Sequence, residues 1–186
     1  MRLGQLEARL GERIEIEWKS FMLRPRPGRR TREEFVAYTE SWRRPAAMEP
    51  AAELRPWATA DDPPSHSLPA LVAAKVAAGF GRDAYDAYHL ALLRAYFAEN
   101  RTISTPAVQA EIADEVGIGR EAFADRLAAE RDDCVEVVLA EHESAVNNGI
   151  TAVPTVLLGD VLAVPGAQDV EVYERLITKI TERRAG

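Results

Sequence analysis

The sequence is poor in the side chains that form covalent cross-links and metal sites. It contains one cysteine, Cys134, so it can form no internal disulfide bond and holds no cysteine pair for dithiol chemistry. Its three histidines, His66, His89 and His142, are widely spaced and form no His-x-x-x-His pair. We therefore expect neither a structural disulfide nor a metal site.

Long apolar runs and basic patches are also lacking. No stretch approaches the roughly 18 consecutive apolar residues of a membrane span, and the opening residues MRLGQLEARLGER lack the apolar core of a secretory signal. The net charge is −7 at pH 7 and only residues 24–32 are locally basic, so the surface as a whole repels a phosphate backbone. The sequence thus predicts a soluble, cytoplasmic protein that binds neither membranes nor nucleic acids.

The sequence does contain ample material for a hydrophobic core. Its 186 residues are 47% hydrophobic and 28% charged, which predicts one domain, or one domain with a large insertion. Leu3, Leu6 and Leu10 recur at helical spacing, which predicts a helix from the first residues to Gly11. Residues 13–23 then alternate apolar and charged side chains, which predicts a strand.

The middle of the chain, from Thr31 to about Glu130, reads as almost wholly helical. A proline-rich stretch from Pro45 to Pro69 interrupts it, and Pro106 suits the first position of a helix. The expected helices are Arg32–Trp42, Leu71–Ala78, Asp83–Glu99, one that begins near Thr105, and Arg120–Arg131.

The last part of the chain mixes helices and strands. Asp132 and Asp133 suit the start of a helix, and Gly149 suits its end. Two short strands follow, PTVLLG and VLAV, joined by a tight Gly-Asp turn. The final helix is expected from Gln168 to about Arg183.

Pro154 stands immediately before the strand-like run 155–158. Proline has no N–H to donate, so it is tolerated at the first residue of a strand and excluded from its middle. Pro154 therefore marks the entrance of the strand. An ordinary trans peptide bond before Pro154 would fit this position, because only about 5–6% of the peptide bonds that precede proline in folded proteins are cis.

The segment AVNNGITAVPTVLLGDVLAVPGAQ carries a specific pattern, Gly-Ile-x-x-Val-Pro-Thr followed two strand lengths later by Gly-Ala-Gln. Together with IEIEWKSFMLRP, HSLPALVAAKVAAGFG and ALLRAYFAENRTIS, it resembles the DsbA-like branch of the thioredoxin superfamily. Within that branch it is most similar to FrnE-like dithiol–disulfide isomerases, 2-hydroxychromene-2-carboxylate isomerases and kappa-class glutathione transferases. The resemblance implies an α/β thioredoxin-like fold with a large all-helical insertion. Residues 1–30 and 132–186 would form the discontinuous thioredoxin-like domain, and residues 31–131 the insertion.

The resemblance also implies a site. In this superfamily the bond before the corresponding proline is cis and lies beside the active site. The bend would turn the main-chain groups of Val153 outward toward an extended substrate, which makes Ala152, Val153 and Pro154 the expected substrate-binding residues. Gln168 opens the last helix, where glutathione-using relatives hold the γ-glutamyl end of glutathione, although a plain capping turn is the alternative. The dithiol relatives imply no cofactor, and the glutathione-using relatives imply glutathione.

The family's reactive residue is not found in this sequence. Redox members carry Cys-Pro-x-Cys just after the first strand, and the isomerase and transferase relatives carry serine there. This sequence begins inside what should be the next helix, so we expect the first strand and the catalytic residue upstream of Met1. Alternatively, the remaining strands rearrange or pair with another chain, as in a homodimer. Cys134 lies among acidic residues and is expected to be packed and inert.

The leading functional hypothesis is a dithiol–disulfide oxidoreductase or isomerase of the FrnE type. It would act on protein or small-molecule thiols and disulfides, with catalytic cysteines that this sequence does not contain. A glutathione-dependent isomerase or transferase of the same fold is the first alternative. The second is a redox-inactive binding module that keeps the proline groove.

Overall fold

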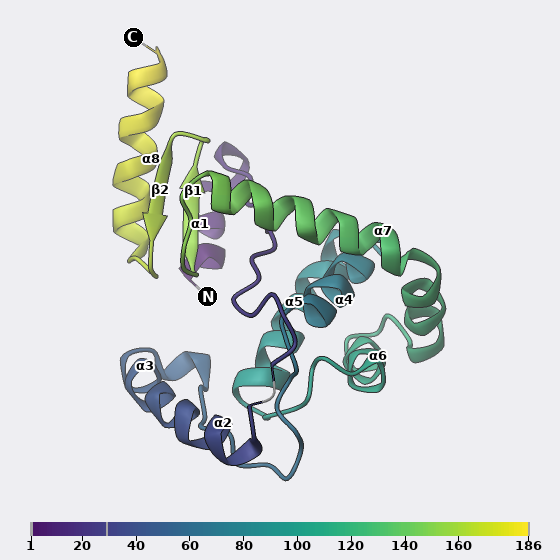
Figure 1. The fold of residues 1–186 in the computed structure, drawn as a ribbon. Coiled ribbons are helices and arrows are strands. Elements are labelled where there is room, and N and C mark those ends of the chain that lie inside the picture. The colour runs from purple at the N-terminus through teal and green to yellow at the C-terminus, as the bar shows by residue number, and fades with distance from the viewer. Residues whose placement is uncertain (1, 29, 186) are drawn as a thin grey trace. The chain divides into compact units, whose positions relative to one another are not determined.

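A computed structural model describes residues 2–28 and 30–185, which divide into two compact units (Figure 1). Unit 1 comprises residues 1–23 and 141–186, and unit 2 comprises residues 24–140. Each unit has a hydrophobic cluster of its own. The domain boundaries implied by the family resemblance stay a prediction. Within the described ranges, no helix has the length and apolar character needed to cross a membrane.

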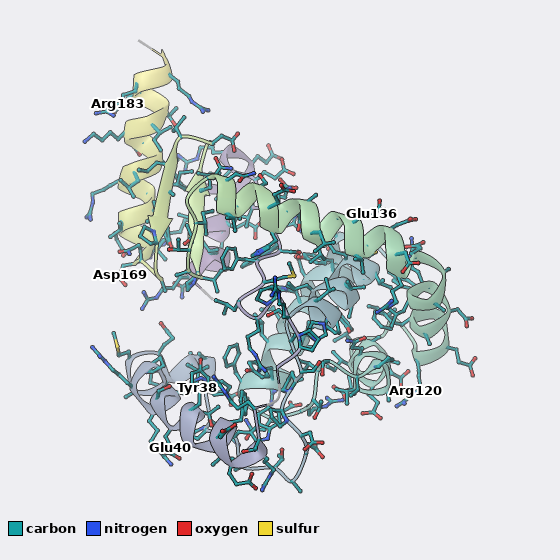
Figure 2. The ribbon with its side chains drawn as sticks, viewed as in Figure 1. Tyr38, Glu40, Arg120, Glu136, Asp169 and Arg183 are labelled. Atoms are coloured by element: carbon teal, nitrogen blue, oxygen red, sulfur yellow. The ribbon has the colours of Figure 1, made fainter. Side chains whose placement is uncertain are left out.

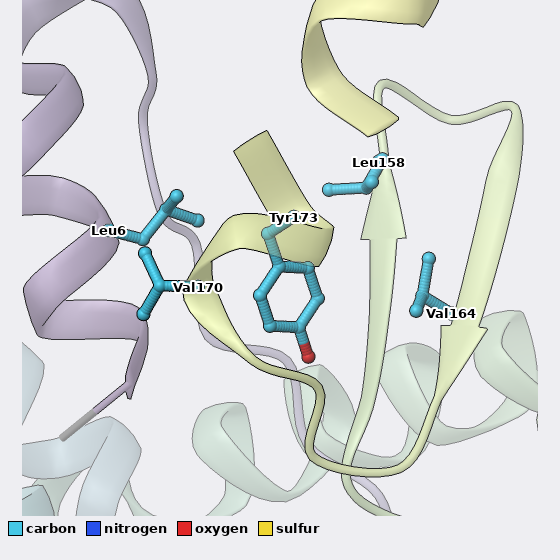
Figure 3. Close-up of a cluster of buried hydrophobic side chains, with 5 residues drawn as sticks. All are labelled: Leu6, Leu158, Val164, Val170 and Tyr173. Atoms are coloured by element: carbon cyan, nitrogen blue, oxygen red, sulfur yellow. The ribbon is translucent and has the colours of Figure 1, made fainter. Parts of the chain in front are cut away.

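Unit 1 packs two helices on a β-hairpin. Strands β1 (Thr155–Leu158) and β2 (Leu162–Pro165) run antiparallel, with Thr155 opposite Pro165 and Leu158 opposite Leu162. Helices α1 (Arg2–Leu10) and α8 (Val170–Ala185) come from the two ends of the chain. Buried side chains from all four elements meet in the cluster drawn in Figure 3: Leu6, Leu158, Val164, Val170 and Tyr173.

Unit 2 is helical throughout its described elements. An aromatic cluster of Phe35, Trp42 and Trp57 lies at the start of the unit, and charged side chains such as Glu40 project outward (Figure 2). The helices and helical turns are α2 (Arg32–Thr39), η2 (Glu40–Trp42), α3 (Arg43–Met48), η3 (Pro50–Ala52), α4 (Leu68–Ala78), α5 (Arg82–Phe97), α6 (Pro106–Glu115) and the first part of α7 (Arg120–Asn147).

Most of the elements expected from the sequence are confirmed within a few residues. The first helix ends at Leu10, Pro106 opens α6, and both short strands form a hairpin. The fold class is therefore confirmed as mostly helical, with a small two-stranded sheet among residues 2–28 and 30–185.

The strand expected over residues 13–23 is wrong. A short 3₁₀ turn, η1 (Gly11–Arg13), is followed by extended chain that joins no sheet in the described structure. The alternation itself is present, because Ile14 and Ile16 are half-buried while Glu15 and Glu17 are exposed. A strand also needs a neighbour for its main-chain groups, and alternation cannot supply one. Instead, side chains of α7 satisfy two amides of this segment: Ser20 donates to Glu141 (2.7 Å) and Met22 to His142 Nδ1 (3.2 Å).

The two helices expected on either side of Asp132 are in fact one helix, α7. No glycine or proline occurs between Arg120 and Asn147, and the exposed Asp132 can occupy a helix interior at a cost of less than about 1 kcal/mol. Burial of Phe123 and Val138, both 0% exposed, outweighs that cost. The acidic residues that suggested a cap therefore lie in mid-helix.

Helix α7 ends in a turn that requires glycine. Gly149 has φ +74°, its N–H donates to Val146 C=O (2.9 Å), and the N–H of Ile150 donates to Ala145 C=O (3.0 Å), the pattern of a Schellman motif. A Cβ at Gly149 would meet no atom within 4 Å, so the need is conformational and not steric.

We expect Gly149→Ala to lower the free energy of unfolding by about 1 kcal/mol, because alanine must adopt a left-handed conformation there. The matched control is Gly4→Ala in α1, where a Cβ also meets nothing within 4 Å. Gly4→Ala should raise stability by about 0.5–1 kcal/mol, since alanine is the better helix former. Urea titrations measure both changes, and equal effects of the same sign would contradict this explanation.

Candidate functional site

The candidate site is the loop of residues 151–154, which connects the end of α7 to β1. The Val153–Pro154 peptide bond is cis, the form that the family resemblance implied. Ala152, Val153 and Pro154 are all exposed, with Val153 at 44%. Thr155 Oγ1 donates to the carbonyl of Ala152 (2.8 Å), which fixes the loop against the first residue of the strand.

A second hydrogen bond fixes the loop against the turn that precedes α8. The N–H of Gly166 donates to the carbonyl of Pro154 (2.8 Å), which extends the register of the hairpin by one pair. Gly166 has φ +76°, a conformation that favours glycine. Residues 154 and 166 therefore lie together at the open end of the hairpin.

This bond also determines which main-chain groups stay free. Main-chain groups alternate between the two edges of a strand, so Pro154, Val156 and Leu158 face β2. The N–H and C=O groups of Val153, Thr155 and Leu157 consequently face the opposite edge. Within residues 2–28 and 30–185, no hydrogen-bond partner occupies these groups. The site thus presents unpaired donors and acceptors that an extended ligand can meet.

Gln168 lies at the same end of the hairpin. Its Nε2 donates to the carbonyl of Pro165 (2.9 Å), and its main-chain N–H lies 3.4 Å from the Tyr173 hydroxyl. In this conformation Gln168 stabilises the turn before α8. Nearby, Arg2 pairs with Asp169 (3.2 Å) and donates to the carbonyl of Ala167 (3.2 Å).

The structure therefore brings all four expected site residues, 152, 153, 154 and 168, to one end of the hairpin. Three further residues hold them, and the sequence reasoning missed these: Thr155, Gly166 and Tyr173. The Pro165-Gly166 break was a visible signal for a special turn. Nothing in the sequence indicated that the Tyr173 hydroxyl lies near the carbonyl of Gly166 (3.4 Å).

The described structure places no reactive sulfur at this loop. Cys134, the only cysteine of the sequence, is buried on α7 and belongs to unit 2, whereas the loop belongs to unit 1. Burial raises the pKa of the Cys134 thiol, and the carboxylates of Glu130 and Asp133 raise it further. A thiol is the weaker nucleophile compared with its thiolate, so Cys134 is poorly suited to catalysis.

Within the described ranges, no group of three histidine, cysteine, aspartate or glutamate side chains lies close enough together to hold a metal ion. His142 has a structural role. Its Nδ1 accepts a hydrogen bond from the main-chain N–H of Met22, and its ring lies edge-on to Phe21 at 5.0 Å between centroids. An accepting Nδ1 places the proton of the neutral imidazole on Nε2.

Comparisons with known proteins agree with this fold. The uncharacterized protein YwbO of Bacillus subtilis (strain 168) is 26% identical over 174 residues, which cover 92% of this chain and 85% of YwbO. A candidate protein disulfide isomerase of Nitrosomonas europaea has a similar fold, with a TM-score of 0.70 at 13% identity over 85% of this chain and 79% of that one.

The cytosolic disulfide reductase DsbM of Pseudomonas aeruginosa also shares the fold. Its TM-score is 0.64 at 17% identity, over 100% of this chain and 91% of DsbM. A second DsbM structure, determined with GSH, gives the same TM-score at 16% identity. The sequence model of the DSBA-like thioredoxin domain matches residues 1–178. Because that match spans nearly the whole sequence, the chain belongs to the DSBA-like thioredoxin domain family.

Proposed function

We propose that this chain is the substrate-binding part of a thiol–disulfide oxidoreductase of the dithiol–disulfide isomerase, FrnE-like type. One observation carries the proposal: the exposed 151–154 loop presents the unpaired main-chain groups of Val153 next to Pro154. Membership of the DSBA-like family and a fold shared with the disulfide reductase DsbM support the same reaction class.

The reacting sulfur is proposed to come from a residue that this sequence does not contain. Thiol–disulfide exchange requires a thiolate that attacks a disulfide sulfur, and the only thiol of the chain is buried with a raised pKa. The residues present would bind the substrate: Val153 would pair with its main chain, and Ala152 and Pro154 would flank it. Protein or small-molecule thiols and disulfides are the proposed substrates, in the cytosol, where DsbM acts by its description.

A glutathione-dependent reaction is the second candidate, favoured by the fold shared with DsbM in its structure with GSH. Glutathione would lie extended along Val153, with its γ-glutamyl end toward Gln168 at the start of α8. For this to happen, the amide of Gln168 must turn from Pro165 to the ligand. Calorimetry with Gln168→Ala then separates the two candidates, because only glutathione binding should weaken.

The test of the binding proposal uses two peptides. One is a short, blocked alanine peptide with a central cysteine, and the other is the same peptide with N-methyl groups on the residues beside the cysteine. If Val153 pairs with the ligand main chain, methylation removes about two hydrogen bonds and weakens binding about tenfold or more. The amide signals of Ala152 and Val153 should move on titration with the first peptide. Equal affinity of the two peptides would contradict main-chain recognition.

The test of the catalytic proposal is insulin reduction with dithiothreitol as reductant. This chain alone should give no turnover above the uncatalysed rate, because it lacks a reactive thiol. Cys134→Ser should behave identically. Measurable turnover that Cys134→Ser abolishes would show that the chain uses its own cysteine and would overturn the proposal that the sulfur comes from elsewhere. Peptide binding without any turnover in a longer form that contains the family's cysteine motif would favour the redox-inactive binding module.

A further inference from the structure

The basic segment of residues 18–32 has no part in the proposed function. It contains six arginine and lysine residues and no acidic residue, although the whole sequence carries a net charge of −7. Two of its arginines fix the segment to the rest of unit 2. The guanidinium of Arg24 donates to the carbonyls of Pro64 (3.1 Å) and Ser65 (3.0 Å), and that of Arg32 donates twice to one main-chain carbonyl (2.9 and 2.6 Å).

Arg30 lies between these two anchored arginines and is exposed. Its guanidinium carbon lies 4.5 Å from the centroid of the Tyr38 ring, a cation–π contact. Among the described residues, no hydrogen bond or ion pair occupies its N–H groups. Tyr38, labelled in Figure 2, is 51% exposed. A guanidinium that stacks on a ring still directs its five N–H groups outward in its own plane, so Arg30 can bind a ligand from solvent.

The hydroxyl of Tyr96 lies near the same arginines. The Tyr96 ring is half-buried against Trp42 and Trp57, at 5.4 and 6.1 Å between centroids. Burial raises the pKa of Tyr96 to about 12, while the charges of Arg24 and Arg30 act in the opposite direction, as nearby cations do. The hydroxyl therefore keeps its proton at neutral pH. It makes no hydrogen bond within the described structure, where every fully buried side-chain N or O atom has a partner, so it reaches solvent.

We propose that these side chains form a binding site for the phosphate group of a small phosphate monoester, a ligand that the proposed function does not use. The site consists of Arg24, Arg30, Tyr38 and Tyr96, all in unit 2. A phosphate monoester carries a charge of about −1.5 to −2 at pH 7 and three strong acceptor oxygens. The site offers two guanidinium groups and two phenolic hydroxyls as donors, and no carboxylate is among the groups that act on Tyr96.

The charge distribution favours a small ligand over a polymer or a membrane. Outside residues 18–32 the sequence is more acidic than its net charge of −7 indicates. A nucleic acid or an anionic membrane, which presents many phosphodiesters, would be repelled by these acidic residues, whereas one phosphate group meets only the local positive charge. The rings are also held in advance, because Tyr38 lies 5.9 Å from Phe35 between centroids and Tyr96 packs on Trp42. Little side-chain entropy is lost on binding.

The first test is an NMR titration of the whole chain with methyl phosphate at constant ionic strength. We expect saturable binding with a Kd of about 1 mM or tighter, with shifts of the Arg30 Nε–H and of the Tyr38 and Tyr96 ring signals. Dimethyl phosphate is a singly charged diester, like the phosphates of nucleic acids and phospholipids, and should bind at least about fivefold more weakly. Absence of saturation, saturation without shifts of Arg30 and Tyr96, or equal affinity for the diester overturns the proposal.

The second test compares variants in the same titration. Arg30→Ala removes the unpartnered guanidinium and should weaken methyl phosphate binding about tenfold or more. Tyr96→Phe keeps the packed ring, removes the donor and should weaken binding about fivefold. Arg24 is left in place because it anchors the segment.

The matched control is Arg26→Ala, which removes the same charge from the same segment. Arg26 is exposed and is not among the groups that act on Tyr96, so its loss should change the affinity by less than about twofold. Urea titrations confirm that each variant is folded. Equal weakening by Arg30→Ala and Arg26→Ala would show diffuse attraction by charge and overturn the site. A Tyr96→Phe variant that binds as tightly as the unmodified chain would contradict it as well.

Discussion

Replacing Tyr173 with alanine is expected to lower the free energy of unfolding of unit 1 by about 3–5 kcal/mol. Tyr173 is 2% exposed and lies in the cluster that joins α8 to both strands and to α1 (Figure 3). Removal of its ring leaves a cavity between elements from both ends of the chain, which cannot collapse without moving the hairpin. Urea denaturation followed by far-ultraviolet circular dichroism measures the loss.

The matched control is Tyr173→Phe, which keeps the ring and removes the hydroxyl. Among the described residues, that hydroxyl makes two long contacts, 3.4 Å to the carbonyl of Gly166 and 3.4 Å from the amide of Gln168, so the control should lower the free energy of unfolding by less than about 1 kcal/mol. Tyr173→Ala should also weaken peptide binding, since Gly166 holds Pro154 in place. A Tyr173→Phe variant as unstable as Tyr173→Ala would show that the hydroxyl, and not the ring, holds the unit together.

The second large effect is expected in unit 2, where Phe35→Ala should lower the free energy of unfolding by about 3–5 kcal/mol. Phe35 is 1% exposed and meets Trp57 edge-on at 5.3 Å and Trp42 edge-on at 6.2 Å between ring centroids. Such edge-to-face pairs add to the energy of burial itself. Loss of the ring should shift tryptophan emission to longer wavelength and lower the urea midpoint.

Tyr38→Ala is the control for that change. Tyr38 lies one turn along the same helix, with its ring centroid 5.9 Å from that of Phe35, but its side chain is 51% exposed. Removal of this half-exposed ring should lower the free energy of unfolding by less than about 1.5 kcal/mol. Peptide binding at the 151–154 loop should survive Phe35→Ala, because the loop belongs to the other unit. Equal losses in Phe35→Ala and Tyr38→Ala would contradict the assignment of Phe35 to the core.

The sequence predicted the parts of this fold that local rules govern. Helical spacing located α1, a proline at the first helical position located α6, and turn residues located the hairpin. The strand over residues 13–23 failed because alternation reports which side chains are buried and not whether a neighbouring strand is present. The break expected at Asp132 failed because packing along α7 outweighs a weak preference for a helix cap.

For the candidate site, the sequence identified the loop but not what holds it. Val153 and Pro154 could be found because a specific motif contains them. The free edge could not, because which residues of β1 face outward depends on the single bond from Gly166 to Pro154. A register shifted by one residue would have left the main-chain N–H and C=O of Val156 unpaired instead of those of Thr155. Pairing partners are a property of the assembled sheet.

The two ends of the chain build unit 1 together, and this determines the order in which the protein can acquire its structure during synthesis. Unit 2 is continuous in sequence, so it can fold as soon as residue 140 has left the ribosome. Helix α1 is made before unit 2, yet its partners in α8 are made after unit 2: the ion pair between Arg9 and Glu171 joins residues 162 positions apart. Helix α1 must therefore wait, with its apolar face uncovered, until α8 has been made.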